Sequence, residues 1–436
     1  MIKDCAFLVY QPLRQRRKDN SFDGNDNIGA KVIADALDRD GIKVGYVTPE
    51  SAHTVPVVLV SLTSTYDVYA LLQAVSPLAN WQPKAREFKV LAGGFGMQNP
   101  TAIRKYIDYA AFGRAHAWVS GVVSKIISGN APSGLSLMDM REFNAVGIAQ
   151  GDLYPHEVEG FKESFTGCSG KCKFCHFTYA RKHVSVDDNC DSYSQGLLTK
   201  GSSPEMLWKS IPNVTAKMGR VRVAIDGLSE RLRYLYGKQI SNKDIVDGIN
   251  HMGSFGPNAT TMIVYNVVNF PGETERDYQE LVDTISQSSP KYRVIFVLHS
   301  TPFRPSLITP MQWEEARLFP GWSKKRTQVM VDRPNLRAVH SFTLETPWSH
   351  LKNVVAERAT PEDDEAIHAI CFSPKLNNSK HSLALKIFKR HFGADKWTAE
   401  RPLDNPPAGF LSSYTSNGTL KKIARKMRSV KDSWRA

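Results

Sequence analysis

The chain has 436 residues, of which 42% are hydrophobic and 23% charged, and its formal net charge is +13. These proportions argue against a fibrous or disordered protein, and the length allows two or three globular domains. Six cysteines in this length are too few for a disulfide scaffold. No apolar run reaches the roughly 18–20 residues of a membrane span, and the run at Cys5–Tyr10 is too short for a signal peptide. We therefore expect a cytoplasmic protein with no membrane partner.

Residues 1–130 alternate between predicted strands and predicted helices, a pattern that predicts a doubly wound parallel sheet with helices on both faces. The predicted strands are Cys5–Tyr10, Lys43–Val47, Val55–Leu62, Phe88–Ala92 and Tyr109–Phe112, and the predicted helices are Ile28–Asp40 and Tyr66–Val75. Ligands of such sheets bind beyond the carboxyl ends of the strands. Gly93 and Gly94 follow the fourth strand, where they allow either a close approach to a ligand or simply a tight turn.

Residues 131–160 have little periodicity and are expected to form a connector. Strand–helix units resume over residues 161–310. The predicted strands there are Val221–Ile225, Thr261–Val268 and Arg293–His299, and the predicted helices are Asn242–His251 and Glu275–Ile285. Residues 311–436 change character, with more tryptophan, irregular spacing and a basic tail. We expect them to form a separate C-terminal substrate or cap region.

Three cysteines stand close together near the start of residues 161–310. Cys168, Cys172 and Cys175 have the spacing C-x3-C-x2-C, with the aromatic residue Phe174 just before the last cysteine. Three thiolates on a tight loop can hold three irons of a four-iron cluster and leave the fourth iron open for chemistry. The intervening Ser169-Gly170-Lys171 suits a loop whose backbone amides turn toward sulfur.

A zinc site is the alternative interpretation of these cysteines. Zinc prefers four tetrahedral ligands, and His176, His183 or Cys190 could supply the fourth. A zinc ribbon usually presents two C-x2-C pairs, however, and this segment has one.

The cysteine spacing, with Phe174 in place, resembles the signature of the radical S-adenosylmethionine (radical SAM) enzymes. Three later segments, in the expected order, are similar to parts of the same family. Ile225–Leu232 resembles the segment after the fourth strand, Val264–Thr274 the Pro-Gly-Glu segment that closes the fifth, and His299–Met311 the end of the barrel in the cobalamin-linked subgroup. The resemblance implies a partial (β/α)6 barrel over residues 161–310.

This resemblance implies a four-iron–four-sulfur cluster on Cys168, Cys172 and Cys175. SAM would chelate the open iron, and an electron from a reductant such as flavodoxin or ferredoxin would cleave it to a 5′-deoxyadenosyl radical. The catalytic and metal-binding residues would then be these three cysteines.

The resemblance also implies cofactor contacts outside the cysteines. Phe174, Asn269 and Gly272 would lie near the adenine of SAM, and Ser229 and Glu230 near its ribose or methionine. For Ser229 and Glu230, a helix N-cap with an acidic first turn is an equal alternative.

The chain departs from the family pattern in three places. Asn269 and Asp226 stand where many members have glycine and glutamate, and no Gly-Gly-Glu follows the second strand of the barrel region.

The order of strands in residues 1–130, with Gly93 and Gly94 after the fourth, resembles the cobalamin-binding domain that precedes many radical SAM barrels. The usual Asp-x-His-x-x-Gly motif is absent, and residues 11–29 contain no histidine to serve as a lower axial ligand of cobalt. Either cobalamin binds without that ligand or the domain is a scaffold. A methylthiotransferase is disfavoured, because that branch has three more cysteines in this domain and this chain has only Cys5 there.

Charge suggests the class of substrate. One basic cluster is Arg14–Lys18, and another comprises Lys421, Lys422, Arg425, Lys426, Arg428 and Lys431. With Trp397 and Trp434 as residues that could stack on bases, these clusters favour modification of a nucleotide or nucleic-acid base. The alternatives are a cobalamin-dependent methyltransferase acting on a small metabolite or peptide, and a non-catalytic metal-cluster module that binds nucleic acid. Core packing is the more frequent role for any single tryptophan.

Overall fold

The computed structural model describes residues 3–10, 28–63, 65–94, 96–134, 136–142, 146–147, 157–158, 161–163, 165–166, 168, 170–180, 184–185, 197–199, 208–215, 218–318, 327–342, 346–377, 379–404, 411–412 and 417–434. The basic cluster at 14–18 and the candidate zinc ligands His183 and Cys190 lie outside these ranges. Within them, no helix is both long enough and apolar enough to cross a membrane.

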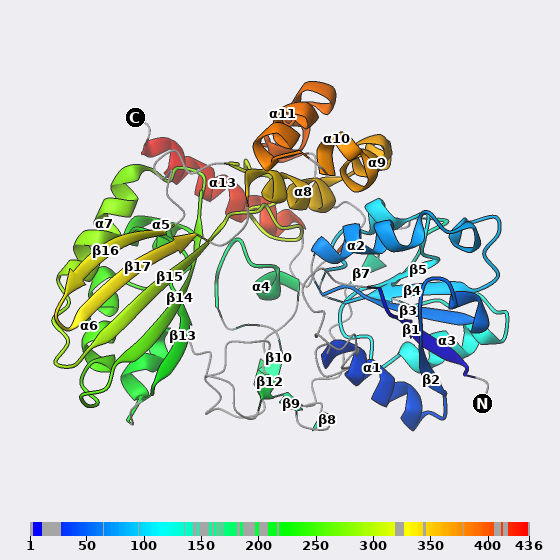
Figure 1. Cartoon of the computed structure of the whole chain (residues 1–436), viewed down its shortest axis with the longest axis horizontal. Coiled ribbons are helices and arrows are strands. Elements are labelled where there is room, and N and C mark those ends of the chain that lie inside the picture. The colour runs from blue at the N-terminus through cyan, green and yellow to red at the C-terminus, as the bar shows by residue number, and fades with distance from the viewer. Residues whose placement is uncertain are drawn as a thin grey trace.

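The first sheet has the strand order β2-β1-β3-β4-β5-β6 (Figure 1). Its strands are β1 (Cys5–Leu8), β2 (Val44–Val47), β3 (Val57–Ser61), β4 (Lys89–Gly93), β5 (Tyr109–Ala111) and β6 (Leu137–Asp139). The first five pair in parallel, and β6 is antiparallel to β5. The five strands expected in residues 1–130 are therefore confirmed, and β6 extends the sheet into the region expected to be a connector.

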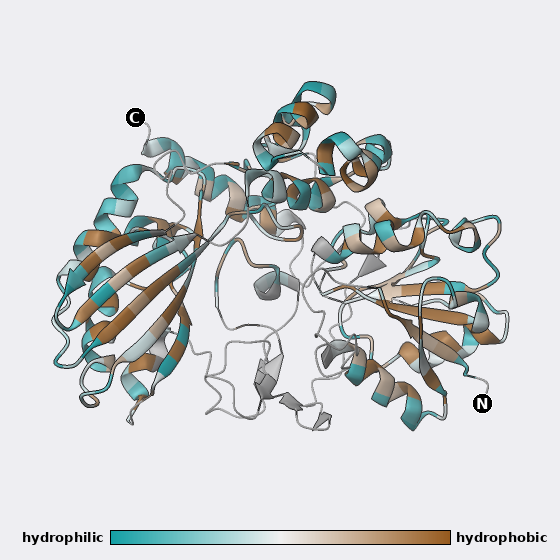
Figure 2. Ribbon diagram, in the orientation of Figure 1, coloured by the Kyte–Doolittle hydropathy of each residue, from teal (hydrophilic) through white to brown (hydrophobic). Residues whose placement is uncertain are grey.

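Helices cover both faces of the first sheet, as predicted. They are α1 (Ile28–Arg39), α2 (Thr65–Val75) and α3 (Val119–Ile127). Leu37 of α1 and Val123 of α3 share one core with the strands, and Val68 and Leu71 of α2 belong to the core on the other face. Figure 2 shows hydrophobic residues concentrated along the strands of both sheets and hydrophilic ones on the outer sides of many helices.

The second sheet has the order β13-β14-β15-β17-β16. Its strands are β13 (Arg220–Ala224), β14 (Thr260–Val268), β15 (Val294–Pro302), β16 (Thr327–Arg333) and β17 (Leu336–Phe342). All pair in parallel except β16, which is antiparallel to β17. The α/β class is confirmed. In the part of the chain that the structure describes, the sheet is open and has four parallel strands where the resemblance implied six, and most of residues 181–207, just before β13, lie outside that part.

Alternate residues of these strands are buried beneath the helices. Met262 and Val264 of β14, with Phe296 and Leu298 of β15, pack in one core with Ile249. The helices are α5 (Glu230–Leu235), α6 (Asn242–Met252), which carries Ile249, and α7 (Glu275–Ser286). The period of two in the strands and the apolar side of each helix explain why this layer was predictable.

The C-terminal region contributes strands β16 and β17 to the second sheet, and several of its helices pack in a core of the first sheet. Its helices are α8 (Pro347–Arg358), α9 (Asp364–Phe372), α10 (Pro374–Asn377), α11 (His381–Phe392), α12 (Asp395–Thr398) and α13 (Asn417–Ser433). Residues of α8 to α12 share the core of α2, and Tyr69 donates a hydrogen bond to the carbonyl oxygen of Lys352 at 2.5 Å. Trp397 is 1% exposed in this core, so its predicted role in stacking on bases is wrong and the core alternative holds.

Short elements complete the described chain. The strands are β7 (Val146–Gly147), β8 (Glu157–Val158), β9 (Phe161–Glu163), β10 (Phe165–Thr166), β11 (Val184–Ser185), β12 (Leu197–Thr199) and β18 (Leu411–Ser412); the helix α4 spans His176–Ala180; and the 3-10 turns are η2 (Ala52–Thr54), η3 (Ala79–Trp81), η4 (Pro100–Ile103), η5 (Trp208–Asn213) and η6 (Pro361–Asp363). β10 and β11 pair antiparallel, Thr166 with Val184, and so close the base of the segment that contains the cysteine loop and α4.

Candidate metal-cluster site

Cys168, Cys172 and Cys175 are all free thiols on one loop, and Cys172 is buried. The amide of Gly170 donates to Sγ of Cys168 at 3.3 Å. A Cβ atom at Gly170 would lie 3.2 Å from Sγ of Cys168 and 3.7 Å from Sγ of Cys172. The missing side chain of Gly170 therefore lets the backbone pass close to two of the three sulfurs, as a loop around a sulfur-bound cluster requires.

Burial is the main influence on the protonation of the Cys172 thiol. Burial raises the pKa of its thiol to about 12; Lys238 opposes the rise, while Asp226 and the other two cysteines add to it. A metal that binds this sulfur must displace the thiol proton, because the thiolate is the ligand. The three thiols thus fit an iron–sulfur cluster in donor chemistry. Among the described residues, no three His, Cys, Asp or Glu side chains are already grouped around one metal-ion position.

The cysteine loop is seated on the C-terminal end of α5. Gly237 has a φ of +88°, and a Cβ atom there would lie 2.0 Å from the carbonyl oxygen of Lys171. The amide of Lys173 donates to the carbonyl oxygen of Tyr236 at 2.8 Å, and its ammonium group donates to that of Leu235. A cation is favourable at this end of a helix, where the last carbonyl oxygens lack partners.

Phe174 joins this loop to the segment after β14. Its ring centroid lies 5.3 Å from that of Phe270, which stacks on Tyr236 at 4.4 Å and packs on Phe303 at 5.4 Å. The hydroxyl of Tyr236 donates to the carbonyl oxygen of Pro271. The structure therefore brings together three of the segments whose sequences resemble the radical SAM pattern, through an aromatic cluster that sequence reasoning did not identify.

Asn269 and Gly272 both lie in the turn after β14. Asn269 has a φ of +64°, which explains why glycine suits this position in other sequences. Its amide N–H donates to Glu273 at 2.8 Å, and its side chain donates to the carbonyl oxygen of Arg317 at 3.2 Å. Their assignment to the adenine of SAM stays a prediction.

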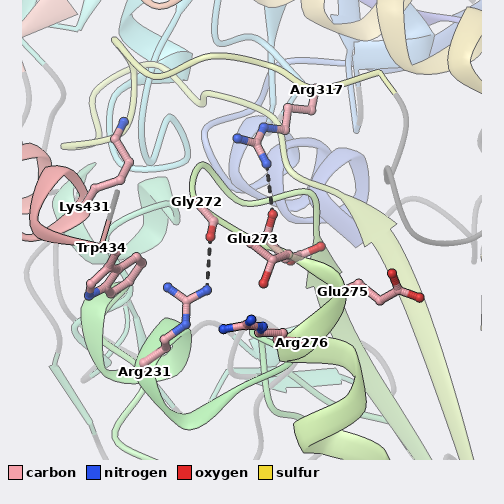
Figure 3. Close-up of a pocket in the computed structure, with 9 residues that line it drawn as sticks. Arg231, Gly272, Glu273, Glu275, Arg276, Arg317, Lys431 and Trp434 are labelled. Atoms are coloured by element: carbon pink, nitrogen blue, oxygen red, sulfur yellow. Dashed lines mark hydrogen bonds between the residues drawn. The ribbon is translucent and has the colours of Figure 1, made fainter. Parts of the chain in front are cut away.

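The outer side of this turn forms a pocket of about 730 Å³ (Figure 3). Arg231 donates to the carbonyl oxygen of Gly272 at 3.1 Å, and Arg317 donates to that of Glu273 at 3.1 Å. Trp434 lies against Gly272, and the guanidinium of Arg231 lies 4.1 Å from its ring centroid. These cations hold the backbone of the turn, and Trp434 packs against it.

Ser229 and Glu230 lie at the start of α5, with Ser229 as its N-cap residue. Ser229 is fully buried and its hydroxyl donates to Asp277. The carboxylate of Glu230 accepts from the amide of Asn242. These contacts support the structural alternative for both residues, although the side chain of Ser229 does not cap the helix itself.

Two contacts near the cysteines were missed at the sequence level. Lys238 forms a buried ion pair with Asp226 at 2.6 Å, and both charges act on Cys172. The amide of Gln98 lies 3.3 Å from Nδ1 of His176, and Ser306 donates to the other end of Gln98 at 3.0 Å. Gln98 comes from the first sheet's side of the molecule, and no local sequence signal links it to α4.

Gly93 is the last residue of β4, and Gly94 follows it. Gly94 has a φ of +104°, and a Cβ atom there would lie 2.4 Å from the carbonyl oxygen of Leu62. The close packing between β3 and β4 therefore explains by itself why glycine is needed at position 94. This supports the tight-turn alternative, and cobalamin binding stays a prediction.

No family model matches the chain, and no curated protein matches it. The solved structures that are weakly similar to the chain include three of the cobalamin-dependent S-adenosylmethionine radical enzyme OxsB. The form with aqua-cobalamin is 10% identical with a TM-score of 0.39, over 65% of this chain and 52%, about half, of that one. The form that also holds S-adenosylmethionine is 10% identical with a TM-score of 0.41, over 99% and 79%. The apo form is 9% identical with a TM-score of 0.30, over 98% and 61%. Likenesses this weak assign no activity to the chain.

Proposed function

We propose that the chain is a radical SAM enzyme, of transferase or isomerase type, that holds a four-iron–four-sulfur cluster on Cys168, Cys172 and Cys175. The approach of the Gly170 backbone to two of the three sulfurs is the main support. When bound, the cluster and SAM supply a 5′-deoxyadenosyl radical able to take hydrogen from an unreactive C–H bond.

The residues of the chain have separate tasks in this proposal. The amide of Gly170 donates a hydrogen bond to Sγ of Cys168, which would stabilise the negative charge of this cluster ligand. Phe174 and the aromatic cluster behind it exclude water from one side of the loop. The Lys238–Asp226 pair fixes a cation and an anion beside Cys172. The proposal includes an electron donor such as flavodoxin or ferredoxin.

We propose a nucleotide or nucleic-acid base as the substrate, supported by the net charge of +13. A cobalamin-dependent methyltransferase acting on a small metabolite or peptide is the second candidate. It is supported by the parallel first sheet, whose strand β4 ends at Gly93 on the edge where such sheets bind ligands.

The radical assignment is tested with anaerobically purified protein, dithionite and SAM. We expect 5′-deoxyadenosine together with a brown chromophore, both lost in Cys172→Ala. Cys371→Ala is the matched control, since Cys371 is an equally buried free thiol outside the loop. A wild-type protein with bound iron and sulfide that forms no 5′-deoxyadenosine contradicts the proposal.

The substrate class is tested by mass spectrometry of nucleosides and metabolites from cells that express wild type or Cys172→Ala. A nucleoside that differs between the two supports the first candidate. A methylated metabolite, together with cobalamin retained after desalting, supports the second.

A further inference from the structure

The helices α10 and α11 carry a cluster of cations without intervening acids. Residues 366–394 contain no aspartate or glutamate but contain five basic residues, all exposed. These five residues, which we call the basic surface, are Lys375, Lys380, Lys386, Lys389 and Arg390. Mixed charges are the norm on protein surfaces, so an acid-free run of this length is a distinctive feature.

The fold of α11 turns these charges outward. Ala384, Leu385 and Phe388 are buried in the core shared with the first sheet. Lys386, Lys389 and Arg390 are spaced three and four residues apart and therefore lie together on the opposite side. Figure 1 shows α11 at the outer edge of the C-terminal helices.

The basic surface keeps its positive charge in the part of the chain that the structure describes. In the described ranges no ion pair joins any of its five residues to a carboxylate. Two acids at the start of α9 are paired elsewhere: Asp363 with Lys396 at 2.5 Å, and Asp364 with Arg104 at 2.6 Å.

The basic stripe of α13, which the sequence suggested for polyanion binding, differs in this respect. Lys421 pairs with Asp404 at 3.5 Å, Arg428 with Glu314 at 3.2 Å and Lys431 with Glu314 at 2.6 Å. Half of the cations in that stripe are therefore paired with carboxylates of the protein itself. The expected binding site for a polyanion thus moves to α10 and α11.

Helix stability does not account for the basic surface. Lys389 and Arg390 lie in the last turn of α11, where cations stabilise the helix dipole. Lys380, however, is at the N-cap of the same helix, where the dipole disfavours a cation. A partner that carries negative charge along its length explains both ends.

We propose that the basic surface binds the phosphate backbone of nucleic acid. A convex helix surface does not enclose a small molecule, whereas α11, with 12 residues and so roughly 18 Å long, matches several consecutive phosphates. A lipid surface is a poorer partner, because the apolar side of α11 is buried in the core and cannot enter a bilayer. This proposal does not depend on the radical chemistry. It adds to the proposed function that a substrate base would be bound as part of a nucleic-acid polymer.

The test measures fluorescence anisotropy of a labelled 30-base-pair DNA duplex and of a 30-nucleotide single-stranded RNA with the full-length protein, at several salt concentrations. The variant Lys386→Gln/Lys389→Gln/Arg390→Gln removes three charges from the basic surface. The matched control Lys422→Gln/Arg425→Gln/Lys426→Gln removes three from the exposed side of α13. Glutamine keeps helix propensity in both, and circular dichroism checks their folding.

We expect binding by wild type to weaken as salt rises. In the basic-surface variant, the slope of log association constant against log salt concentration should become shallower by about 2–3, because each of three lost phosphate contacts contributes about 0.7–0.9. The control should keep the wild-type slope. Equal effects of the two variants, or absence of binding by wild type, would each overturn the proposal. Because both variants should still form 5′-deoxyadenosine, failure of binding is distinguishable from failure of the radical assignment.

Discussion

A Cβ atom on Gly237 would lie 2.0 Å from the carbonyl oxygen of Lys171, inside the cysteine loop. The two residues are far apart in the sequence, yet the turn after α5 is the surface on which the loop rests. The lack of a side chain at Gly237 thus sets the position of Cys172, whose Cα would lie 3.4 Å from the same Cβ.

We predict that Gly237→Ala displaces the cysteine loop and lowers the iron bound per chain severalfold after reconstitution. The physical reason is overlap with backbone, which cannot be relieved by a side-chain rotation. Iron and sulfide analysis with the visible spectrum measures the effect.

Gly129→Ala is the matched control for Gly237→Ala. Gly129 has a similar φ of +74° but nothing within 4 Å of its Cβ position. The left-handed backbone should cost both variants about 1–2 kcal/mol in free energy of unfolding. Equal iron content in the two variants would show that the contact with Lys171 does not matter.

α13 packs against the same aromatic cluster as the cysteine loop. Met427 is 3% exposed within the aromatic cluster, against which Phe174 packs. We predict that Met427→Ala lowers the free energy of unfolding by about 2–5 kcal/mol and reduces iron retention. Val430→Ala, at a side chain 37% exposed on the same helix, should change stability by less than about 0.5 kcal/mol. Denaturant titration compares the two, and similar losses would contradict this role of Met427.

Arg358 connects three separate stretches of the C-terminal region. Arg358 is 1% exposed, and its guanidinium donates to the carbonyl oxygens of Trp397 at 2.7 Å, Gln312 at 2.9 Å and Glu314. Arg358→Met would leave these oxygens buried without donors, so we expect a loss of about 3–5 kcal/mol in free energy of unfolding. Arg390→Met, at an exposed position, should cost under about 0.5 kcal/mol, and equal midpoints in urea would refute the assignment.

His350 should make the protein sensitive to acid. Burial, followed by the charge of Arg304, lowers the pKa of its imidazole from 6.5 to about 3. The unfolded chain therefore takes up a proton below pH 6.5 while the folded chain does not. Stability is full above pH 6.5 and is lost as the pH falls toward 3, by up to several kcal/mol.

His350→Leu should flatten this acid dependence. Neither ring nitrogen of His350 has a hydrogen-bond partner in the described structure, so we expect the variant to be as stable as wild type, or more so, at pH 7. The exposed variant His391→Leu should keep the wild-type slope between pH 6.5 and 4. Free energies of unfolding across this range measure both, and an unchanged slope in His350→Leu would reject the prediction.

The predicted strands agree with the structure where buried residues alternate or run continuously, as in β3 and β14. The strand β16, at the edge of the sheet, and its neighbour β17 were missed because Thr327–Arg333 and Leu336–Phe342 mix polar and apolar residues. In the site, the cysteine loop and the Pro271–Gly272 turn were found from local patterns. The contacts of Lys238, Gln98 and Arg358 join residues distant in sequence, and local patterns do not carry that information.

The shared core of α2 with α8, α9 and α11 bears on how the chain becomes stable. Val68 and Leu71 from the first sheet's side bury their side chains against the region that contains Trp348, Ile367 and Phe388. A fragment that ends after β6 would leave this apolar surface in water, where it would promote aggregation. The first sheet is thus no autonomous module to be exchanged between enzymes. Its integrity depends on residues synthesised more than 200 positions later, and heat should unfold both parts in one cooperative step.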